Sequence, residues 1–454
     1  MSRKNKGSIA PLLIMLTLIG GSLFIYFSSM FERNVPVISM ETNGYWNLKK
    51  PLNLTISDDS GVKSYKIIMK TSKEEKILEY EKLLQPNNLL KLQVAPPRSV
   101  HSIKDKNIEI IVEANDSSKW NMLNGNSAKK VFKLIVDKRK PKLNILSNSY
   151  KISKGGSALV IFKLQDENLD KMYIEGNNGK RFIPQAFYKD GYYISLIAWP
   201  VIDNNFRATV IAKDKAGNVS KSYVPLYLKQ KSYKVSNIKL SDKFLKGKIA
   251  ELAEEFVETE GVDNSLEQFK IINEDVRAKN EELIHNLTPK VPDEKIMNFR
   301  MNKMYPLKNA QVVAHFGDHR IYYYNGSKIS EAYHLGLDLA SNAMAAIKLQ
   351  NSGEVIFADD NGLYGNMLAI SYGLGLYSIF GHCSSIKVNV GDITKKREIV
   401  ANTGNSGYAM GDHLHFGILV QGVEVRPQEW MDRQWIKLNI TDVIKNAKRI
   451  IDRN

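Results

Sequence analysis

Two short segments in the C-terminal third of the chain combine histidine with aspartate at spacings that could bind a metal ion. The chain has 454 residues but only eight histidines. In residues 331–340, EAYHLGLDLA, apolar residues alternate with the others as in a β-strand, so His334 and Asp338 would share one face. A straight strand would hold these two residues about 13 Å apart. A shared ion therefore requires a bend, which Gly336 between them permits.

The second segment, GDHLHFG at 411–417, places His413 and His415 on one strand face, about 7 Å apart. Two imidazoles at this spacing can both bind a metal, or one can bind it while its neighbour acts on the bound water. The spacing leaves both arrangements open. His382 follows a strand-like run and adds a third imidazole. The single cysteine, Cys383, excludes an intrachain disulfide and a cysteine-based metal site.

The order and spacing of these residues resemble a known family. The H-x-x-x-D of residues 334–338 and the H-x-H of residues 413–415, within G-x-x-G-x-x-x-G-D-H-L-H-F, are similar to the motifs of the lysostaphin-like (LytM-type) zinc endopeptidases, which cut peptidoglycan. The resemblance extends from Val312 to Trp430. It includes three further family motifs, which are GEVIFA at 353–358, YGN at 364–366 and VGD at 390–392.

The resemblance implies a role for each matching residue. His334, Asp338 and His415 would be the zinc ligands, with a fourth position open to water. His382 and His413 would orient or deprotonate this water and stabilise the tetrahedral intermediate. Zinc lowers the pKa of such a water toward about 7. The implied function is a zinc-dependent endopeptidase that hydrolyses peptide cross-links of peptidoglycan in wall remodelling. In a Gram-negative wall it would be a D,D-endopeptidase that cuts between D-alanine and meso-diaminopimelate.

Several positions depart from the family pattern, and none of them is an implied ligand. Phe380, Cys383 and Arg397 stand where tyrosine, leucine and glycine are usual. Arg320, in FGDHR, resembles a family arginine that binds substrate carboxylates, but it lies one position late. The tyrosines at 322–324 either supply a hydroxyl to the transition state or are ordinary strand aromatics. Four other histidines are interpreted as bystanders: His101, His285, His315 and His319.

Two functions of a different class stay open. Some members of the family have lost ligands and act as non-enzymatic activators of wall amidases. All five positions are present in this chain, which favours the enzyme. The chain could also be an adhesin or scaffold with a dormant peptidase domain, in which the β domains do the binding.

The N-terminal residues predict a membrane anchor. Residues 9–27 are apolar and long enough to cross a bilayer. Positive charges at Arg3, Lys4 and Lys6 would keep the N-terminus in the cytoplasm and place the catalytic domain on the periplasmic or outer face. A cleaved signal peptide is the alternative, although no small-x-small cleavage site follows. The formal net charge of +16 favours anionic partners, and the lack of a basic stripe with interleaved aromatics argues against nucleic acid.

The middle of the chain predicts a multidomain, mainly β protein. Residues 36–138 and 139–232 are interpreted as two tandem immunoglobulin-like β-sandwiches. A strand followed by an acidic turn at 57–61 is echoed near residues 161–168. The sequence DKAGN at 214–218 resembles the D-x-A-G-N turn that is common in bacterial immunoglobulin-like domains.

Residues 233–295 predict a helical connector and a candidate lid over the substrate groove. Leu245, Ile249, Leu252 and Phe256 recur at helical spacing, and Ser265 with Gln268 has the form of a capping box. The expected partners are peptidoglycan, the inner membrane, and proteins of cell wall synthesis or division. The other predicted parts are an anchor at 1–31, a β-rich peptidase domain of the family's duplicated-hybrid fold at 296–440, and a tail at 441–454.

Overall fold

The structure, a computed structural model, describes residues 9–98 and 103–453. It is mainly β, as the sequence predicts, and it divides into two compact units. The first unit comprises residues 1–140, 168–170 and 213–219, and the second comprises the other residues. Arg3, Lys4, Lys6 and His101, which the sequence analysis singled out, lie outside the described residues.

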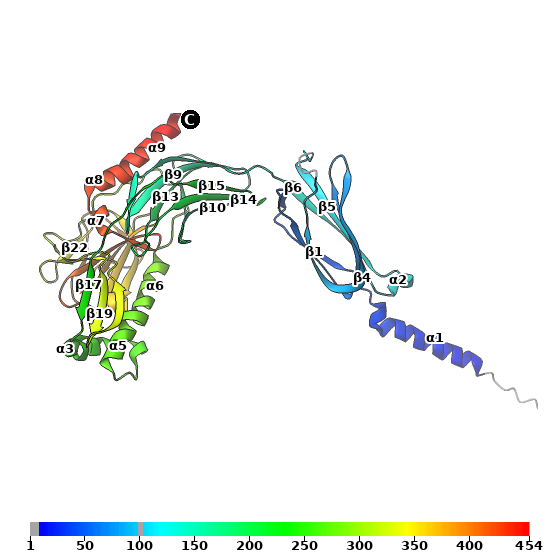
Figure 1. The fold of residues 1–454 in the computed structure, drawn as a ribbon, viewed down its shortest axis with the longest axis horizontal. Helices are drawn as coiled ribbons and strands as arrows, with labels where there is room; N and C mark the ends of the chain where they lie inside the picture. The colour runs from blue at the N-terminus through cyan, green and yellow to red at the C-terminus, as the bar shows by residue number, and fades with distance from the viewer. Residues whose placement is uncertain (1–8, 99–102, 454) are drawn as a thin grey trace, which may run out of the picture. The chain divides into compact units, whose positions relative to one another are not determined.

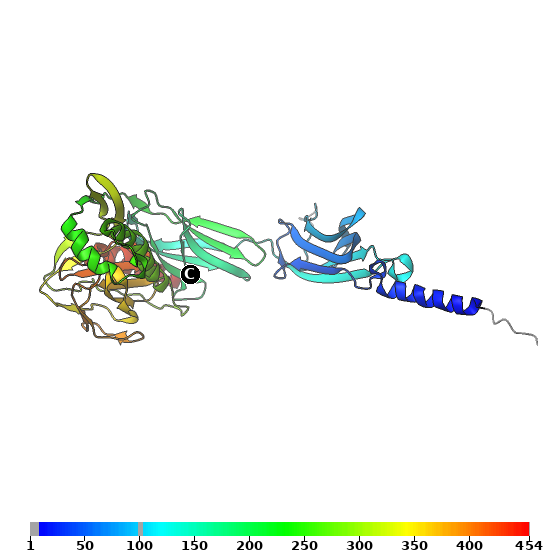
Figure 2. The ribbon, with the colours of Figure 1, turned by 90° about the horizontal axis from the view of Figure 1, so that it is seen from below.

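A single apolar helix, α1 (Ala10–Phe27), stands at the N-terminal end of the described chain (Figure 2). Its first turn contains Pro11, which is tolerated there because the first helical N–H groups have no partner within the helix. The helix contains no charged residue and none of its residues is buried. By length and composition it could cross a membrane, and a signal sequence would pass the same test.

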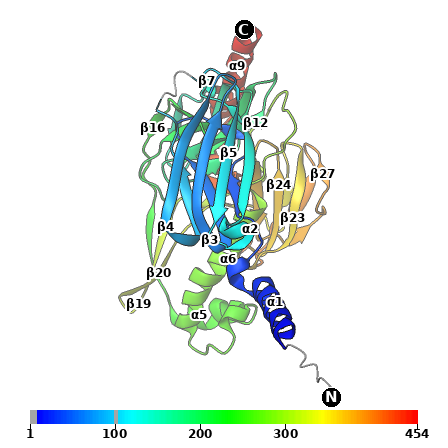
Figure 3. The same cartoon turned by 90° about the vertical axis from the view of Figure 1, so that its right-hand side faces the viewer.

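The first unit holds a six-stranded sheet (Figure 3). Its strand order is β1-β3-β5-β6-β2, and β4 also pairs with β3. The pairs are antiparallel except for β2 with β6. The immunoglobulin-like assignment of residues 36–138 stays a prediction. The strands are β1 (Val37–Glu41), β2 (Tyr45–Trp46), β3 (Leu52–Lys70), β4 (Glu75–Val94), β5 (Asn107–Asp116) and β6 (Ser127–Val136), and a short helix α2 (Trp120–Leu123) joins the last two.

The predicted turn at residues 57–61 is wrong, because β3 runs through it without reversing. The register of β3 against β4 shifts between Ser57 and Val62, so the segment is an irregularity within one long strand. Gly61 has a φ of 87°, a conformation that glycine adopts without strain. The side chain of Asp58 accepts hydrogen bonds from the backbone N–H and the hydroxyl of Ser60, which satisfies donors that the ladder loses here.

Residues 142–229 form two four-stranded sheets and a small parallel pair. One sheet has the order β12-β13-β9-β7 and the other β11-β10-β14-β15. Apolar residues fill β9 on both faces, which is typical of a strand covered on both sides. The strands are β7 (Lys142–Asn148), β8 (Lys151–Ser153), β9 (Ser157–Gln165), β10 (Leu169–Gly176), β11 (Arg181–Phe182), β12 (Gln185–Ala186), β13 (Tyr192–Ala198), β14 (Ala208–Asp214), β15 (Val219–Tyr223) and β16 (Tyr227–Lys229).

The predicted helical connector begins with a strand, β17 (Val235–Lys239), and is helical between Asp242 and Leu287, where its apolar positions pack inward. Leu245, Ile249 and Leu252 are buried in one cluster with Phe269. The second helix is capped by Asn264, one residue before the predicted Ser265. The side-chain oxygen of Asn264 accepts hydrogen bonds from the backbone N–H groups of Leu266 and Glu267. The helices are α3 (Asp242–Phe244), α4 (Ala250–Ala253), α5 (Ser265–Ile271) and α6 (Arg277–Leu287), with π-helical turns at Leu245–Ile249 and Ile272–Val276.

The C-terminal part is built on an eight-stranded sheet (Figure 1). Its order is β18-β21-β29-β25-β24-β23-β27, and β30 also pairs with β29. The strands are β18 (Gln311–Ala314), β21 (Leu337–Ala340), β23 (Gly353–Asp360), β24 (Asn366–Ser371), β25 (Leu376–Gly381), β27 (Ile393–Thr394), β29 (Leu414–Val420) and β30 (Val423–Val425). Two three-stranded sheets flank it. They consist of β17 (Val235–Lys239), β19 (His319–Tyr324) and β20 (Ser327–Tyr333), and of β22 (Ala346–Lys348), β26 (Ser385–Ile386) and β28 (Ile399–Asn402).

The chain ends in helices that join the C-terminal part to the sheets of residues 142–229. Glu429 accepts a hydrogen bond from the N–H of Ser157 at 3.0 Å, and the hydroxyl of Ser149 donates to the carbonyl of Asn439 at 2.9 Å. The predicted tail forms a helix whose apolar residues, among them Val443, are buried. The helices are α7 (Pro427–Trp430), α8 (Arg433–Ile436) and α9 (Asp442–Arg453).

Candidate metal centre

His334 and Asp338 lie on either side of a break in the chain, whereas the sequence predicted one strand. β20 ends at Tyr333 and β21 begins at Leu337, so the bend that a shared ion requires is present. Gly336 serves a different purpose from the predicted one. A Cβ atom at Gly336 would collide with the imidazole of His415, so the glycine leaves room for a neighbouring side chain rather than for an ion directly.

His415 reaches the same place from β29. β21 and β29 are antiparallel, and Asp338 lies directly opposite His415 in their register. On its other side β29 pairs with β25, where Gly381 lies opposite His415. Because β29 is a central strand with partners on both sides, the position of His415 is fixed by two hydrogen-bond ladders.

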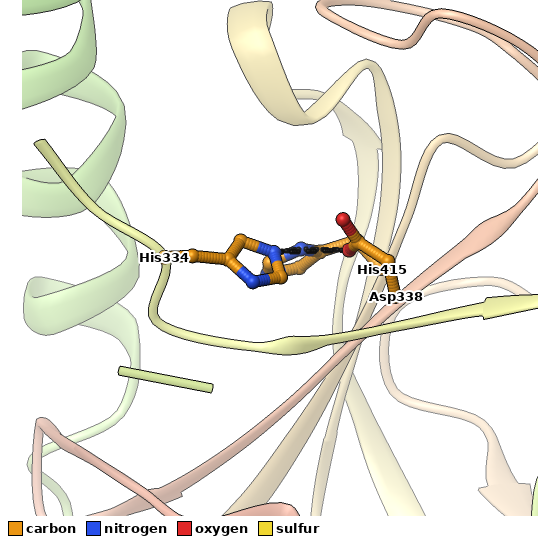
Figure 4. A group of neighbouring side chains, drawn as sticks. All are labelled: His334, Asp338 and His415. Carbon is orange, nitrogen blue, oxygen red and sulfur yellow. Dashed lines mark hydrogen bonds and ion pairs between the residues drawn. The ribbon is translucent and has the colours of Figure 1, made fainter. Parts of the chain in front are cut away.

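Three atoms from these residues converge on one point (Figure 4). His334 Nε2 lies 3.0 Å from Asp338 Oδ1 and 3.2 Å from His415 Nδ1, and His415 Nδ1 lies 3.0 Å from Asp338 Oδ1. Ligands bound tetrahedrally to zinc at about 2.0–2.1 Å are separated by about 3.3 Å. The triangle therefore has nearly the size of one face of a zinc coordination tetrahedron. All three side chains are buried.

A hydrogen bond fixes the proton of one imidazole in this triangle. His334 Nδ1 lies 3.0 Å from the carbonyl of His315 and must carry the proton in order to donate to it. His334 Nε2 then presents a lone pair to a carboxylate oxygen. His415 Nε2 is buried and has no hydrogen-bond partner, so its only polar neighbours lie on the Nδ1 side. Two ring nitrogens and one carboxylate oxygen that converge in a buried place are a donor set that fits a divalent metal such as zinc.

Burial and charge set the protonation of the ligand candidates. Burial raises the pKa of Asp338, but the charges and hydrogen bonds of His334 and His415 outweigh it and hold that pKa well below its usual value. Burial lowers the pKa of His415, against the opposing effect of Asp338. An ionised carboxylate and a neutral imidazole are the forms that bind metal.

His382 and His413 lie beside the triangle, and in each of them, as in His334, ring atom Nδ1 contacts a backbone carbonyl. His382 Nδ1 is 2.9 Å from the carbonyl of Ser406, and His413 Nδ1 is 2.8 Å from the carbonyl of Gly411. Each backbone carbonyl fixes the proton on Nδ1, so each Nε2 carries a lone pair. His413 Nε2 lies 3.8 Å from Asp338. The ring centroids of His382 and His413 are 4.7 Å apart. Two imidazoles near the candidate metal position can thus accept a proton.

His382 is held in an unusual backbone conformation and a buried environment. Its φ is 61°, in the left-handed region that few residues other than glycine adopt. Burial, assisted by His415 and His413, lowers its pKa to about 3. His382 is therefore neutral over the physiological pH range. Residues held in sparsely populated conformations are concentrated at functional sites, which agrees with the position of His382.

A hollow of about 420 Å³ opens over the metal candidates. Arg320 lines it, with its guanidinium 3.6 Å from Asp318. None of the tyrosines at 322–324 is among its lining residues, and Tyr322 is buried in the core beside Phe269. Arg277 of α6 and Tyr408 also line the hollow, and neither was singled out from the sequence. Tyr364, the first residue of the YGN motif, lines it as well, with its ring edge-on to His415.

The predicted bystander histidines within the described residues have structural contacts. The carbonyl of His315 orients His334, so this residue takes part through its backbone. His319 lies 2.9 Å from Glu331 and stacks on Tyr333. His285 lies 2.7 Å from Glu424.

Comparison with known proteins agrees with this geometry. The sequence profile of peptidase family M23 matches residues 332–427, which include His334, Asp338, His382, His413 and His415. The C-terminal part of the chain is an M23 peptidase domain.

The relatives of the M23 domain differ in function. The murein hydrolase activator EnvC of Escherichia coli is 32% identical over 98 residues, 22% of this chain and 23% of that protein. The DD-carboxypeptidase/endopeptidase Mpg of Neisseria meningitidis is 27% identical over 94 residues, 21% of this chain and 22% of that protein. The solved catalytic domain of lysostaphin from Staphylococcus simulans is 25% identical, with a TM-score of 0.24, and the match covers 27% of this chain and 92% of that domain. The chain spans at most 38% of the length of the first curated relatives that it matches.

Proposed function

We propose that the protein is a zinc-dependent endopeptidase that hydrolyses peptide cross-links of bacterial peptidoglycan, as a D,D-endopeptidase in wall remodelling. The observation that carries the proposal is the buried triangle of His334, Asp338 and His415, with the imidazoles of His382 and His413 beside it and a hollow above it. Three protein ligands with one open side are typical of a catalytic zinc site rather than a structural one. The similarity to the DD-carboxypeptidase/endopeptidase Mpg supports the choice of bond.

The proposed mechanism assigns separate tasks to the two kinds of histidine. When bound, zinc supplies a Lewis acid for the scissile carbonyl and increases the acidity of the attacking water. His334, Asp338 and His415 hold the metal. His413 Nε2 accepts the proton of the water, because its Nδ1–H is already donated to Gly411 and only Nε2 is free. His382 lines the same hollow, and with its Nδ1–H donated to Ser406 its Nε2 would accept a hydrogen bond from the attacking water and orient it.

The residues that line the site favour a substrate that carries both negatively and positively charged groups. Arg277 and Arg320 line the metal hollow, and guanidinium groups bind carboxylates well. A second hollow of about 370 Å³ shares Arg277, Tyr333 and Leu335 with the first and is also lined by Glu281 and Glu424. A peptidoglycan stem peptide with a meso-diaminopimelate residue offers carboxylate and ammonium groups to such a pair of hollows.

The other parts of the chain would position the enzyme. Helix α1 would anchor the protein in the cytoplasmic membrane, with the catalytic domain on the periplasmic or outer face. The β-rich regions at 36–138 and 139–232 would act as immunoglobulin-like spacer and docking domains between the membrane and the wall. Proteins of wall synthesis or division are candidate partners for these regions.

A direct test is digestion of purified sacculi with the full chain in detergent micelles. Zinc-loaded protein should release muropeptides whose masses identify the bond that is cut, and a chelator should abolish the release. Readdition of zinc should restore it. A protein that binds zinc stoichiometrically and releases nothing would refute the proposed hydrolysis.

The alternative is an activator of wall amidases, which the similarity to EnvC supports. Under this hypothesis the chain alone would not cut sacculi, but it would increase the activity of an added amidase. The products distinguish the two functions. An endopeptidase splits cross-linked dimers into monomers, whereas an activated amidase releases peptides from the glycan strands.

A further inference from the structure

A second group of candidate metal ligands lies in the first unit, far along the sequence from the peptidase residues. Glu32, Asp58 and Asp116 each offer a carboxylate oxygen, and these oxygens lie within 4.8 Å of one another. Asp58 is 8% exposed and Asp116 is 1% exposed. Among the described residues, this triad and the peptidase triangle are the groups with such a geometry.

Each carboxylate comes from a different part of the chain. Glu32 follows α1 and a short 3-10 turn at Ser29–Phe31, Asp58 belongs to the irregular segment of β3, and Asp116 ends β5. Hydrogen bonds hold the segment of Glu32 against the residues that follow Asp116. The carbonyl of Glu32 accepts hydrogen bonds from the hydroxyl of Ser118 at 2.6 Å and from the side-chain amide of Asn126 at 3.0 Å.

Two of the carboxylate oxygens have no partner. Asp58 Oδ1 accepts from Ser60, but Asp58 Oδ2 is buried without a hydrogen bond. Glu32 Oε2 is likewise buried without a hydrogen bond. Asp116 is fully hydrogen-bonded, with Oδ1 accepting from the N–H of Ser118 and Asn126, and Oδ2 from the side chain of Asn126. The two unpartnered oxygens therefore belong to Glu32 and Asp58, and Asp116 contributes none.

No positive charge in the described part of the chain balances the triad. No ion pair within the described residues includes Glu32, Asp58 or Asp116. Burial raises the pKa of Glu32, and Asp58, Asp116 and Asp59 add to this effect, opposed only by one backbone N–H. Carboxylates that are gathered in a buried place without a counter-ion must either share protons or bind a cation.

The predicted β-sandwich at 139–232, taken as a second repeat of the one at 36–138, has the same local structure but no cluster of unpartnered oxygens. Asp214 accepts from the backbone and the side chain of Asn218, as Asp116 does from Asn126, and the Asn218 amide donates to the carbonyl of Asp137. In that repeat the side-chain amide of Asn168 donates to Asp137 Oδ2 at 3.0 Å. The corresponding acid of the first repeat, Glu32, has an oxygen with no donor. The unpartnered oxygens are thus specific to the first repeat rather than a general property of its turn.

We propose that Glu32, Asp58 and Asp116 bind a hard divalent cation, for which Ca²⁺ is the best candidate. The set contains only oxygen ligands, which suit Ca²⁺ and Mg²⁺ rather than zinc. Ca²⁺ accepts irregular carboxylate arrangements, whereas Mg²⁺ demands near-octahedral geometry. The bound ion ties the segment that leaves α1 to the ends of β3 and β5. It thereby stiffens the connection between the apolar helix and the first β-rich domain, independently of the peptidase function.

The test is a calcium titration of the full chain in detergent micelles, with the peptidase site loaded with zinc beforehand. Isothermal titration calorimetry should detect one Ca²⁺ per chain with a Kd of about 10⁻⁴–10⁻³ M, the range of extracellular modules. Asp58→Asn should weaken binding at least about tenfold. Glu32→Gln, outside the sheet, should have the same effect if Asp58→Asn disturbs folding. Asp59→Asn is the matched control, since it removes the same charge from an exposed neighbour that lies outside the triad.

Three results would overturn the proposal. One is the absence of binding up to about 10 mM Ca²⁺. Another is equal binding by the Asp58→Asn and Asp59→Asn proteins. The third is a heat-unfolding midpoint that is insensitive to Ca²⁺ but falls more steeply between pH 5 and pH 8 in the unsubstituted chain than in Asp58→Asn, because that difference assigns the cluster to a shared proton.

Discussion

At the scale of single residues, the two histidines of the H-x-H motif have different neighbours. His415 is buried and faces His334 and Asp338, whereas His413 keeps a free Nε2 toward the hollow. Adjacent positions on one strand face can therefore separate metal binding from proton transfer. The separation is testable because the two properties can be measured independently.

His415→Ala and His413→Ala should fail in different ways. His415→Ala should lose both bound zinc and activity, since it removes one of the three proposed ligands. His413→Ala should keep stoichiometric zinc and lose activity by about 10²–10⁴-fold, the usual contribution of a general base. Atomic absorption and muropeptide release measure the two properties. Equal zinc loss in both proteins would contradict the assignment of His413 as a base.

Gly336 is a second residue whose replacement should affect the metal without removing a ligand. A methyl group at Gly336 would displace the His415 ring, so Gly336→Ala should weaken zinc binding by about 10–100-fold, as a disturbed ligand environment typically does. Gly411→Ala is the matched control, because a Cβ atom there meets no atom within 4 Å. Competition with a fluorescent zinc chelator gives both affinities. A normal affinity in Gly336→Ala would show that the ring can move aside.

At the scale of elements, the sequence predicts the site residues that lie on strands. It does not predict the residues that reach the site because distant elements pack against one another. Period-two alternation is local, so His413 and His415 could be placed on one face from the sequence alone. The break at His334 was predictable only as a requirement of the shared ion. Arg277 could not be assigned to the site, because α6 comes near it through distant contacts, such as that of Asn280 with Leu363.

The position of Arg277 predicts a role for the connector helix in substrate binding. Its guanidinium is hydrogen-bonded to Asn273, and the residue lines both hollows. Within the described residues it forms no ion pair with an acidic side chain. Arg277→Ala should raise KM for a cross-linked muropeptide by about tenfold, the value of one charged hydrogen bond, with zinc content unchanged. Lys279→Ala is the control, because Lys279 lies two residues further along α6 and is exposed. An unchanged KM would exclude Arg277 from substrate binding.

Helix α7 carries a buried acid that predicts a pH dependence of stability. Burial raises the pKa of Glu429 to about 7, against the effects of Ser157 and Arg426. The folded chain then binds the proton more tightly than the unfolded chain, so stability is greatest below about pH 4.5 and falls as the pH rises toward 7. Glu429→Gln keeps an acceptor for the N–H of Ser157 and removes the titration.

The expected size of this effect is about 1–3 kcal/mol between pH 5 and pH 8. Urea unfolding at both values measures it, and Glu429→Gln should be more stable than the unsubstituted chain at pH 8 and have a flatter pH profile. A parallel pH profile in the two proteins would mean that Glu429 stays ionised beside Arg426, which lies 3.6 Å away.

At the scale of the whole molecule, the two predicted β-sandwich regions differ in their relation to the peptidase. The region that follows residue 140 belongs mostly to the second unit and makes direct hydrogen bonds to the M23 domain. Gln421, at the end of β29, is buried and bonds the backbone N–H of Ile183 at 2.7 Å. This region therefore supports the M23 domain, whereas the region before residue 140 forms a unit of its own.

This difference predicts the outcome of two truncations. A chain that begins at Pro141 keeps the contacts within the second unit and should digest isolated sacculi within about twofold of the full chain. A chain that begins at Tyr233 loses the partners of Glu429, Gln421 and Asn439, and leaves buried polar groups unpaired at a cost of about 1–3 kcal/mol each. It should therefore aggregate or unfold at a lower temperature. Full activity and an unchanged unfolding midpoint in the shorter chain would show that the M23 domain needs no support from residues 141–232.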